Sequence, residues 1–166
     1  ANDRFVNRIP LTGEFAEATG YNIRATHETG EPDHGFAGGQ QSVWWTWTAP
    51  ASGNASITTW GSSYDTALGI YTGSAVNTLT PVANNDDEAP PVVRTSRGTF
   101  AALAGTAYHF AVDGFLYTDN FGSPLGTDVG LISVTLSLDG KSRLDGFKLR
   151  PDGHYEFTLK GDSGRK

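Results

Sequence analysis

Carboxylate side chains in predicted loops are the residues of this chain whose types and spacing point most directly to chemistry. Asp86, Asp87 and Glu88 lie in one loop, Asp65 begins a predicted strand, and Asp113 ends another. In a β-sandwich built from these strands, the three places meet at one rim. Calcium takes about six to eight oxygen ligands from carboxylates, amides and carbonyls. The set predicts a calcium site, and the alternative is that Asp65 and Asp86 close turns through Asx hydrogen bonds.

A second acidic set lies near the N-terminus, where Asn2, Asp3 and Glu31 supply amide and carboxylate oxygens. A cation bound by them would join the N-terminal segment to the loop in the 30s. The spacing is not that of an EF-hand loop. We therefore expect calcium as the cofactor, with these metal ligands: Asp3, Glu31, Asp65, Asp86, Asp87 and Asp113.

Aromatic residues at outward strand positions or in loops form the next candidate group: Trp44, Trp60, Tyr64, Tyr71, Phe115, Tyr117 and Phe121. The apolar C–H faces of sugar rings stack on aromatic planes, and sugar hydroxyls hydrogen-bond to Asp, Asn and Gln. The loop 114–122 meets both needs because its aromatic residues are interleaved with Asp and Asn. We expect polysaccharide to be bound by Trp60, Tyr117, Asp119, Asn120 and Phe121. The alternative for each aromatic residue is packing under a long loop.

Patterns typical of catalysis are weak in this chain. The segment 161–164, Gly-Asp-Ser-Gly, matches the surroundings of the serine in chymotrypsin-like proteases. However, Arg165 and Lys166 follow it where Gly-Pro is needed, and no Ala-Ala-His-Cys element precedes it, so we interpret it as a turn. Pro32 prevents the helix that a zinc protease motif would need at 31–34. The chain has no Cys and therefore no thiolate nucleophile. We expect no enzyme activity.

The elements that must position these residues are strands. Alternating patterns occur at 42–48, 57–60, 67–72, 100–103, 108–112 and 129–138. Turn residues separate them, and the turn at 104–106 is expected to close a hairpin between two of them. Short strands with this spacing predict an antiparallel β-sandwich of jelly-roll type.

The charge of the chain is divided between two parts. Residues 1–140 carry 14 acidic and five basic side chains, a net charge of −9, whereas residues 141–166 carry four and seven, a net charge of +3. Segments 146–150 and 154–159 flank Pro-Asp-Gly at 151–153, which predicts a hairpin. We predict one domain at 1–140 and a C-terminal β-hairpin at 141–166 that begins a further, truncated module.

Several motifs together resemble the bacterial pre-peptidase C-terminal-like domains. The motifs are Asn-Asp-Arg-Phe at 2–5, Gly-Glu-Pro-Asp-His at 30–34, Ser-Val-Trp-Trp-Thr-Trp-Thr-Ala-Pro at 42–50, Tyr-Asp-Thr-Ala-Leu-Gly-Ile-Tyr-Thr-Gly at 64–73, Asn-Asp-Asp at 85–87, Ala-Gly-Thr-Ala-Tyr at 104–108 and Ala-Val-Asp-Gly at 111–114. The resemblance covers roughly residues 2–138. It implies a β-sandwich module attached to secreted bacterial enzymes and surface proteins, with polysaccharide, protein or calcium as ligand.

These observations predict a non-catalytic, calcium-stabilised module of a secreted or cell-surface bacterial protein that binds polysaccharide. One alternative is a structural or adhesive spacer without a glycan ligand, and another is a module for a collagen-like protein substrate. The net charge of −6 argues against nucleic acid as a partner, and no apolar run is long enough for a membrane span. We expect the module to be part of a larger multidomain protein and monomeric by itself.

Overall fold

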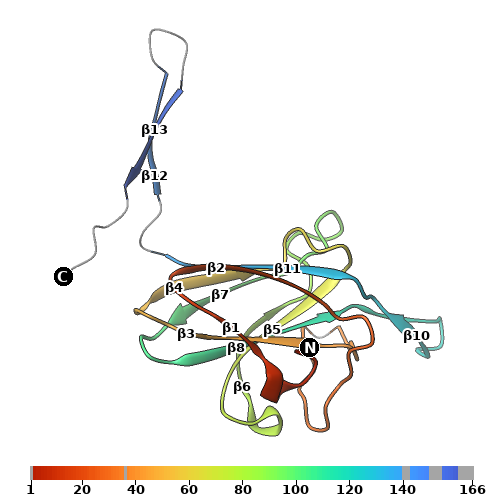
Figure 1. The fold of residues 1–166 in the computed structure, drawn as a ribbon. Helices are drawn as coiled ribbons and strands as arrows, with labels where there is room; N and C mark the ends of the chain where they lie inside the picture. Colours follow the sequence, from red (N-terminus) through yellow and green to blue (C-terminus); the bar gives the residue numbers. More distant parts are fainter. Residues whose placement is uncertain (1, 36, 140–142, 150–154, 161–166) are drawn as a thin grey trace.

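The computed structural model describes residues 2–35, 37–139, 143–149 and 155–160. Two sheets form the two layers of a sandwich (Figure 1). Sheet A has five strands in the order β1 (Ile9–Leu11), β3 (Val43–Thr48), β8 (Ala107–Gly114), β5 (Thr66–Thr72) and β6 (Thr80–Asn85). Sheet B has four strands in the order β2 (Phe15–Tyr21), β11 (Leu131–Leu138), β4 (Gly53–Thr58) and β7 (Arg97–Ala102).

The strand order is that of a jelly roll. Without β1, the two sheets contain eight strands: β2 to β8 and β11. Counted along the chain, β2, β11, β4 and β7 of sheet B are the first, eighth, third and sixth of these. In sheet A, β3, β8, β5 and β6 are the second, seventh, fourth and fifth, which is the jelly-roll order. These neighbours pair antiparallel, whereas β1 joins β3 in parallel. The predicted antiparallel β-sandwich of jelly-roll type is confirmed, with β1 as an added edge strand.

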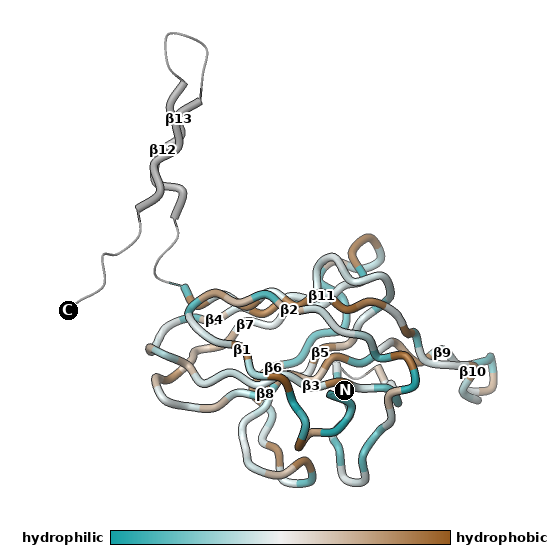
Figure 2. The backbone as a smooth tube through the Cα atoms, in the orientation of Figure 1, coloured by the Kyte–Doolittle hydropathy of each residue, from teal (hydrophilic) through white to brown (hydrophobic). Residues whose placement is uncertain are grey.

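The core between the sheets follows from alternation along the strands. Ile132, Val134 and Leu136 of β11 have no exposed surface, and the residues between them are half-buried. Figure 2 shows apolar and polar residues alternating along this strand. Trp45 and Trp47 of β3 enter the same core from sheet A. Each such side chain stabilises the fold by about 1.5–3 kcal/mol relative to its exposed state.

The turn at 104–106 does not close a hairpin, so that prediction is wrong. β7 pairs with β4 in sheet B, whereas β8 pairs with β3 and β5 in sheet A. The turn crosses between the layers, and Gly105 and Thr106 hydrogen-bond to the backbone of Ala49. Phe100 and Phe110 face each other across the core, with ring centroids 6.3 Å apart. A crossing between sheets and a hairpin share the same turn chemistry, and only the pairing distinguishes them.

Long connections gather at one end of the sandwich. They link β2 to β3 (22–42), β4 to β5 (59–65), β6 to β7 (86–96) and β8 to β11 (115–130). We call this end the loop end. The last connection contains a small hairpin, β9 (Leu116–Thr118) with β10 (Pro124–Thr127), which projects from the body (Figure 1). This end carries most of the residues expected to bind ligands.

The outer face of sheet A is covered by other parts of the chain. The short helix η1 (Phe5–Asn7) and the 22–42 connection lie over it. Trp44 is fully buried there in a second apolar cluster with Phe5, Tyr71 and Ala111. The rings of Phe5 and Trp44 meet edge to face at 5.1 Å. Sheet A therefore contributes to two cores, one on each face.

The remaining described elements are η2 (Val76–Thr78) and a C-terminal pair, β12 (Arg143–Leu149) and β13 (Tyr155–Lys160). β12 and β13 pair antiparallel, which confirms the predicted strands of this hairpin. The predicted turn at 151–153 and the segment 161–164 lie outside the described residues, and the domain division at 140 stays a prediction. No helix among the described residues is long and apolar enough to cross a membrane.

Candidate functional site

Three of the predicted metal ligands meet at the loop end, in a group that we call the acidic rim: Asp65, Asp86 and Asp87. Asp65 directly precedes β5, and the other two follow β6, its antiparallel neighbour, so the pairing brings them to one end. Arg94, in the 86–96 connection, donates a hydrogen bond to Asp65 Oδ2 at 2.9 Å. The one guanidinium at this place therefore pairs with one of the three carboxyl groups.

The electrostatics of the acidic rim favour a bound proton or cation. Burial, followed by the charges of Asp87 and Asp65, raises the pKa of Asp86 to about 6. Burial also raises the pKa of Asp65, although the hydrogen bond from Arg94 opposes this change. Like charges in a partly desolvated place disfavour the ionised form of each group.

Oxygen atoms of the acidic rim are left without partners. Asp65 Oδ1, Asp86 Oδ1 and Asp87 Oδ1 are buried and have no hydrogen-bond partner among the described residues, which is uncommon for buried acceptors. Anywhere among the residues that the structure describes, no three Asp, Glu or His side chains are arranged to hold a metal ion. The unpaired oxygens fit the chemistry of a hard cation, but the three carboxylates would have to turn toward a common point.

Asp113 lies at the same end but in a different environment. Its Oδ1 accepts hydrogen bonds from the backbone N–H groups of Gln41 at 2.9 Å and Gly114 at 2.7 Å. A side chain at Gly39 would collide with this carboxyl group. Burial raises the pKa of Asp113, and these hydrogen bonds oppose the change. Asp113 therefore anchors the end of the 22–42 connection to β8.

The N-terminal acidic set connects the chain through direct hydrogen bonds. Asp3 accepts from the backbone N–H of Thr26 at 2.6 Å and from its hydroxyl group. Glu28 Oε2 accepts from the N–H of Phe5 at 2.6 Å. These bonds join the N-terminal segment to the 22–42 connection, the link for which a cation was expected. Both carboxyl oxygens of Asp3 and of Glu31 have donors, and the two side chains have different partners.

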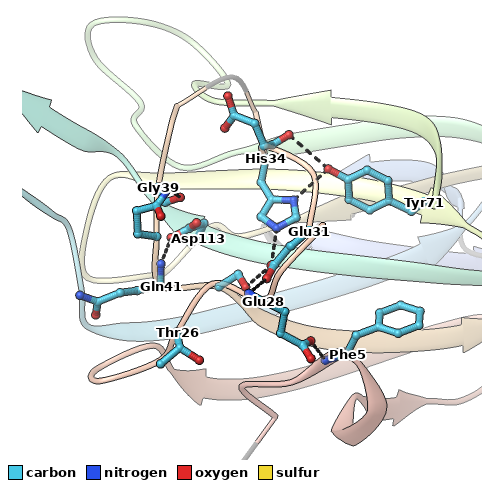
Figure 3. A network of polar contacts seen from close by, with 12 residues as sticks. Phe5, Thr26, Glu28, Glu31, His34, Gly39, Gln41, Tyr71 and Asp113 are labelled. Carbon is cyan, nitrogen blue, oxygen red and sulfur yellow. Dashed lines mark hydrogen bonds and ion pairs between the residues drawn. The ribbon is translucent and has the colours of Figure 1, made fainter. Parts of the chain in front are cut away.

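A buried polar network under the 22–42 connection was not predicted as a unit (Figure 3). Glu31 Oε1 contacts His34 Nε2 at 2.8 Å and also accepts from the hydroxyl of Ser42. His34 Nδ1 lies 2.8 Å from the phenol oxygen of Tyr71. Burial by itself would raise the pKa of Glu31, but the hydrogen bonds from His34, Ser42 and the backbone of Glu28, with the charge of His34, together lower it. All four groups are shielded from solvent, so the network holds the connection against sheet A.

The residues of the loop 114–122 that are expected to bind polysaccharide lie together on the β9–β10 hairpin. Tyr117 is on β9, and Phe121 at the turn is 93% exposed. Asp119 Oδ1 accepts from the N–H groups of Phe121 and Ser123, each at 2.8 Å, so it shapes the turn. Asn120 is exposed beside it. The hairpin therefore presents two aromatic side chains and an amide to solvent.

Trp60 lies on another segment of the loop end and is 57% exposed. It follows β4, where Ser62 hydrogen-bonds to the backbone of Ser133 on β11. Of the other aromatic residues considered, Trp44 and Tyr71 are buried under the 22–42 connection, as the packing alternative predicted.

Comparisons with known proteins give fold likeness at low sequence identity. No protein-family model and no curated protein sequence matches the chain. A periplasmic inhibitor of g-type lysozyme from Aeromonas hydrophila aligns with 80% of this chain and 96% of its own, at 14% identity and a TM-score of 0.47. A surface-associated copper-binding protein from Methylomicrobium album aligns with 78% and 96%, at the same identity and TM-score.

The pre-peptidase C-terminal domain of a collagenase from Bacillus anthracis also aligns. It covers 80% of this chain and 92% of its own, at 17% identity and a TM-score of 0.37. A member of the group that the sequence motifs resemble is thus among the structural neighbours. With every TM-score here below 0.5, function has to be argued from this chain's own residues.

Proposed function

We propose that this protein is a non-catalytic binding module of a secreted or surface-exposed bacterial protein, with polysaccharide as its ligand. The observation that carries the proposal is the β9–β10 hairpin, which projects from the body at the loop end (Figure 1). Its Tyr117 and Phe121 side chains are exposed to solvent. An apolar ring that is 93% exposed gains nothing from the fold of its own domain. Stacking on the C–H face of a sugar provides the missing contact.

The polar groups of the hairpin support the same ligand. Asn120 offers amide donors and an acceptor, and Asp119 keeps the turn in place through its two backbone hydrogen bonds. The phenol of Tyr117 donates to Asp128 Oδ2 at 3.2 Å, so this ring has a fixed orientation. A ring held in place before binding loses less conformational entropy when a ligand stacks on it.

Calcium is proposed as a stabilising ion at the acidic rim. The support is the set of unpaired carboxyl oxygens of Asp65, Asp86 and Asp87, together with the raised pKa of Asp86. A divalent cation would neutralise these groups and supply partners for the oxygens. It would join the start of β5 to the 86–96 connection and so make the loop end more rigid.

The polysaccharide proposal is tested by affinity electrophoresis of the full chain in gels that contain soluble, uncharged polysaccharides such as hydroxyethyl cellulose, glycol chitin or galactomannan. We expect retardation of the wild-type protein and its loss in the double variant Tyr117→Ala/Phe121→Ala. Leu103→Ala is the matched control, because Leu103 is 63% exposed at the opposite end. If both variants are retarded to the same extent as the wild type in every gel, the hairpin is not part of the binding site.

The second candidate function is a structural spacer, and the N-terminal hydrogen bonds favour it. Asp3, Glu28 and Phe5 fix the N-terminal segment to the 22–42 connection, which suits a module that transmits position along a multidomain chain. A spacer would show no retardation in any polysaccharide gel but would gain thermal stability with calcium. The two results together separate the candidates.

A further inference from the structure

The outer face of sheet B is left uncovered by the described residues, unlike that of sheet A. Its outward positions alternate with core positions along four strands. Half of these outward side chains are Ser or Thr: Thr19, Ser56, Thr58, Thr99, Ser133, Thr135 and Ser137. We call this surface the hydroxyl face.

The strand register arranges the hydroxyl groups in rows. Ser137 of β11 lies between Phe15 of β2 and Ser56 of β4, and Ser56 lies opposite Thr99 of β7. Neighbouring strands are ~4.8 Å apart, and residues on the same face of one strand are ~6.8 Å apart. The hydroxyl groups therefore form a regular two-dimensional array, which a polymer with repeated hydroxyl groups can match.

These hydroxyl groups are free to bind a ligand. Thr58 Oγ1 accepts one hydrogen bond, from the N–H of Trp60 at 3.1 Å. Within the described ranges, the other six hydroxyls of the array have no hydrogen bond to protein. The contrast is with the buried hydroxyls of Thr59, Thr66 and Ser96, which bond to one another.

Three exposed aromatic side chains border the hydroxyl face. Phe15 and Tyr21 occupy the two ends of β2 and are 61% and 63% exposed. They are six residues apart on one face of the strand, a separation of ~20 Å. Trp60 follows β4 at the loop end, where its neighbour Ser62 bonds to Ser133. The distance from Phe15 to Tyr21 is longer than a disaccharide, so only a longer sugar chain could contact both rings.

Charged groups are confined to the borders of the hydroxyl face. Glu17 lies on the edge strand β2, and Arg97 lies on the opposite edge strand β7, where it pairs with Glu88 at 2.8 Å. The two central strands, β4 and β11, present no charged side chain to this face. The chain as a whole has a net charge of −6. The face is therefore suited to an uncharged ligand.

A shallow pocket opens where the array meets the end of β11. Its volume is about 330 Å³, at the lower end of the range for small-molecule sites. The outward residues that line it include Asn54, Ser56, Thr99 and Asp139. An amide and a carboxylate thus lie beside the last row of hydroxyl groups, within reach of the hydroxyls of one sugar ring.

The geometry points to an extended, uncharged polysaccharide that lies on the hydroxyl face over β11, parallel to β2, with Phe15 and Tyr21 beside its two ends. This inference rests on the proposed function and adds to it a second contact surface and a class of polysaccharide. A second copy of the chain fits less well, because stable protein interfaces have an apolar, charge-poor centre, and here the centre consists of hydroxyl groups. An ice surface fits less well because the three protruding aromatic side chains would hold it away from the array.

The test uses the full chain and compares two kinds of probe: insoluble microcrystalline cellulose and chitin, and soluble hydroxyethyl cellulose. In depletion assays on the solids, we expect Phe15→Ala/Tyr21→Ala to lower the partition constant about thirtyfold, the loss of roughly one aromatic hot spot. We expect Thr19→Val/Thr135→Val to lower the partition constant by about threefold, because two hydroxyl groups are removed. The change keeps the shape and the β propensity of both residues, so the fold should be unaffected. The hairpin variant Tyr117→Ala/Phe121→Ala should lose retardation in the soluble probe as well.

Each outcome decides between the claims. If the wild type binds the solids and Phe15→Ala/Tyr21→Ala binds equally well, the hydroxyl face is not a binding surface, although the proposed function stands. If the wild type binds neither solids nor soluble chains, the proposed function itself fails. A concentration-dependent dimer in sedimentation velocity that these substitutions abolish would assign the face to a second copy and overturn the inference. Urea unfolding of each variant shows whether a loss of binding is a loss of fold.

Discussion

The two outer faces of this sandwich differ in whether the chain covers them. On sheet A, large aromatic residues point outward, and the N-terminal segment and the 22–42 connection bury them in a second core. On sheet B, small hydroxyl residues point outward and the described chain leaves them half-exposed. An outward side chain of this β-sandwich therefore stabilises the fold where the chain returns to cover it, and it is available to a ligand where the chain does not.

The largest effect that separates the faces is expected from Trp44. Replacing this fully buried side chain by Ala leaves a cavity in the second core and should lower the free energy of unfolding by about 3–5 kcal/mol. The matched change on sheet B, Thr135→Val, should stay within about 0.5 kcal/mol of the wild type. Urea unfolding with a common slope measures both. A loss of similar size in Thr135→Val would show that this hydroxyl group has a partner in the folded protein and is not free for a ligand.

The polar network is the next point at which the comparison can be tested. His34→Ala leaves the buried carboxylate of Glu31 without its imidazole partner, and we expect a loss of about 3 kcal/mol. Tyr71→Phe removes one hydrogen bond to His34 and should lower stability by about 1 kcal/mol. Thermal unfolding gives the order of the two variants. If both were neutral, the network would not be what holds the 22–42 connection on sheet A.

A smaller effect is expected at the acidic rim, and it depends on pH. Because the pKa of Asp86 is raised to about 6 in the folded state, this group favours folding most below its unfolded pKa, and that contribution is lost as the pH rises toward and through 6. Asp86→Asn should therefore be relatively more stable than the wild type at pH 7 in chelator, and the difference should shrink at pH 4. Calcium should reduce the difference at pH 7.

Asp119→Asn is the control, because the contribution of Asp119 to stability has the opposite pH dependence. Backbone hydrogen bonds from Ser123 and Phe121 lower the pKa of Asp119, so its contribution is present above the unfolded pKa and is lost as the pH falls through the folded value. The melting temperature is measured between pH 3 and 8, with chelator and with calcium. A wild type whose melting temperature is unchanged by calcium at pH 7 would contradict the proposed ion.

The sequence predicted the strands well because period two is a local signal. The inward face of β11, with Ile132, Val134 and Leu136, could be read directly from alternation. Pairing was harder to predict, since the turn at 104–106 looks the same whether it closes a hairpin or crosses between sheets. The cover over Trp44 could not be predicted either, because residues 22–42 have no periodic pattern that shows which face they pack on.

The candidate site was predicted in part for the same reason. Asp65, Asp86 and Asp87 precede or follow adjacent strands, so strand order alone brings them to one end. Asp3 lies in the N-terminal segment and Glu31 in the 22–42 connection, but their oxygens are satisfied by donors that no spacing rule reveals. The signal for the buried network was the Glu31 and His34 pair, three residues apart, next to a fully buried Ser42. The burial of these groups becomes apparent only from the fold.

Binding at the uncovered surfaces is measured residue by residue through a map of chemical-shift changes in the labelled protein during titration with a soluble, uncharged hexasaccharide of the cellulose or chitin type. We expect perturbations on the β9–β10 hairpin around Tyr117 and Phe121 and along the hydroxyl face at Thr19, Ser133 and Thr135, with no comparable change around Trp44. No perturbation with either sugar, or changes confined to the covered face of sheet A, would contradict this expectation.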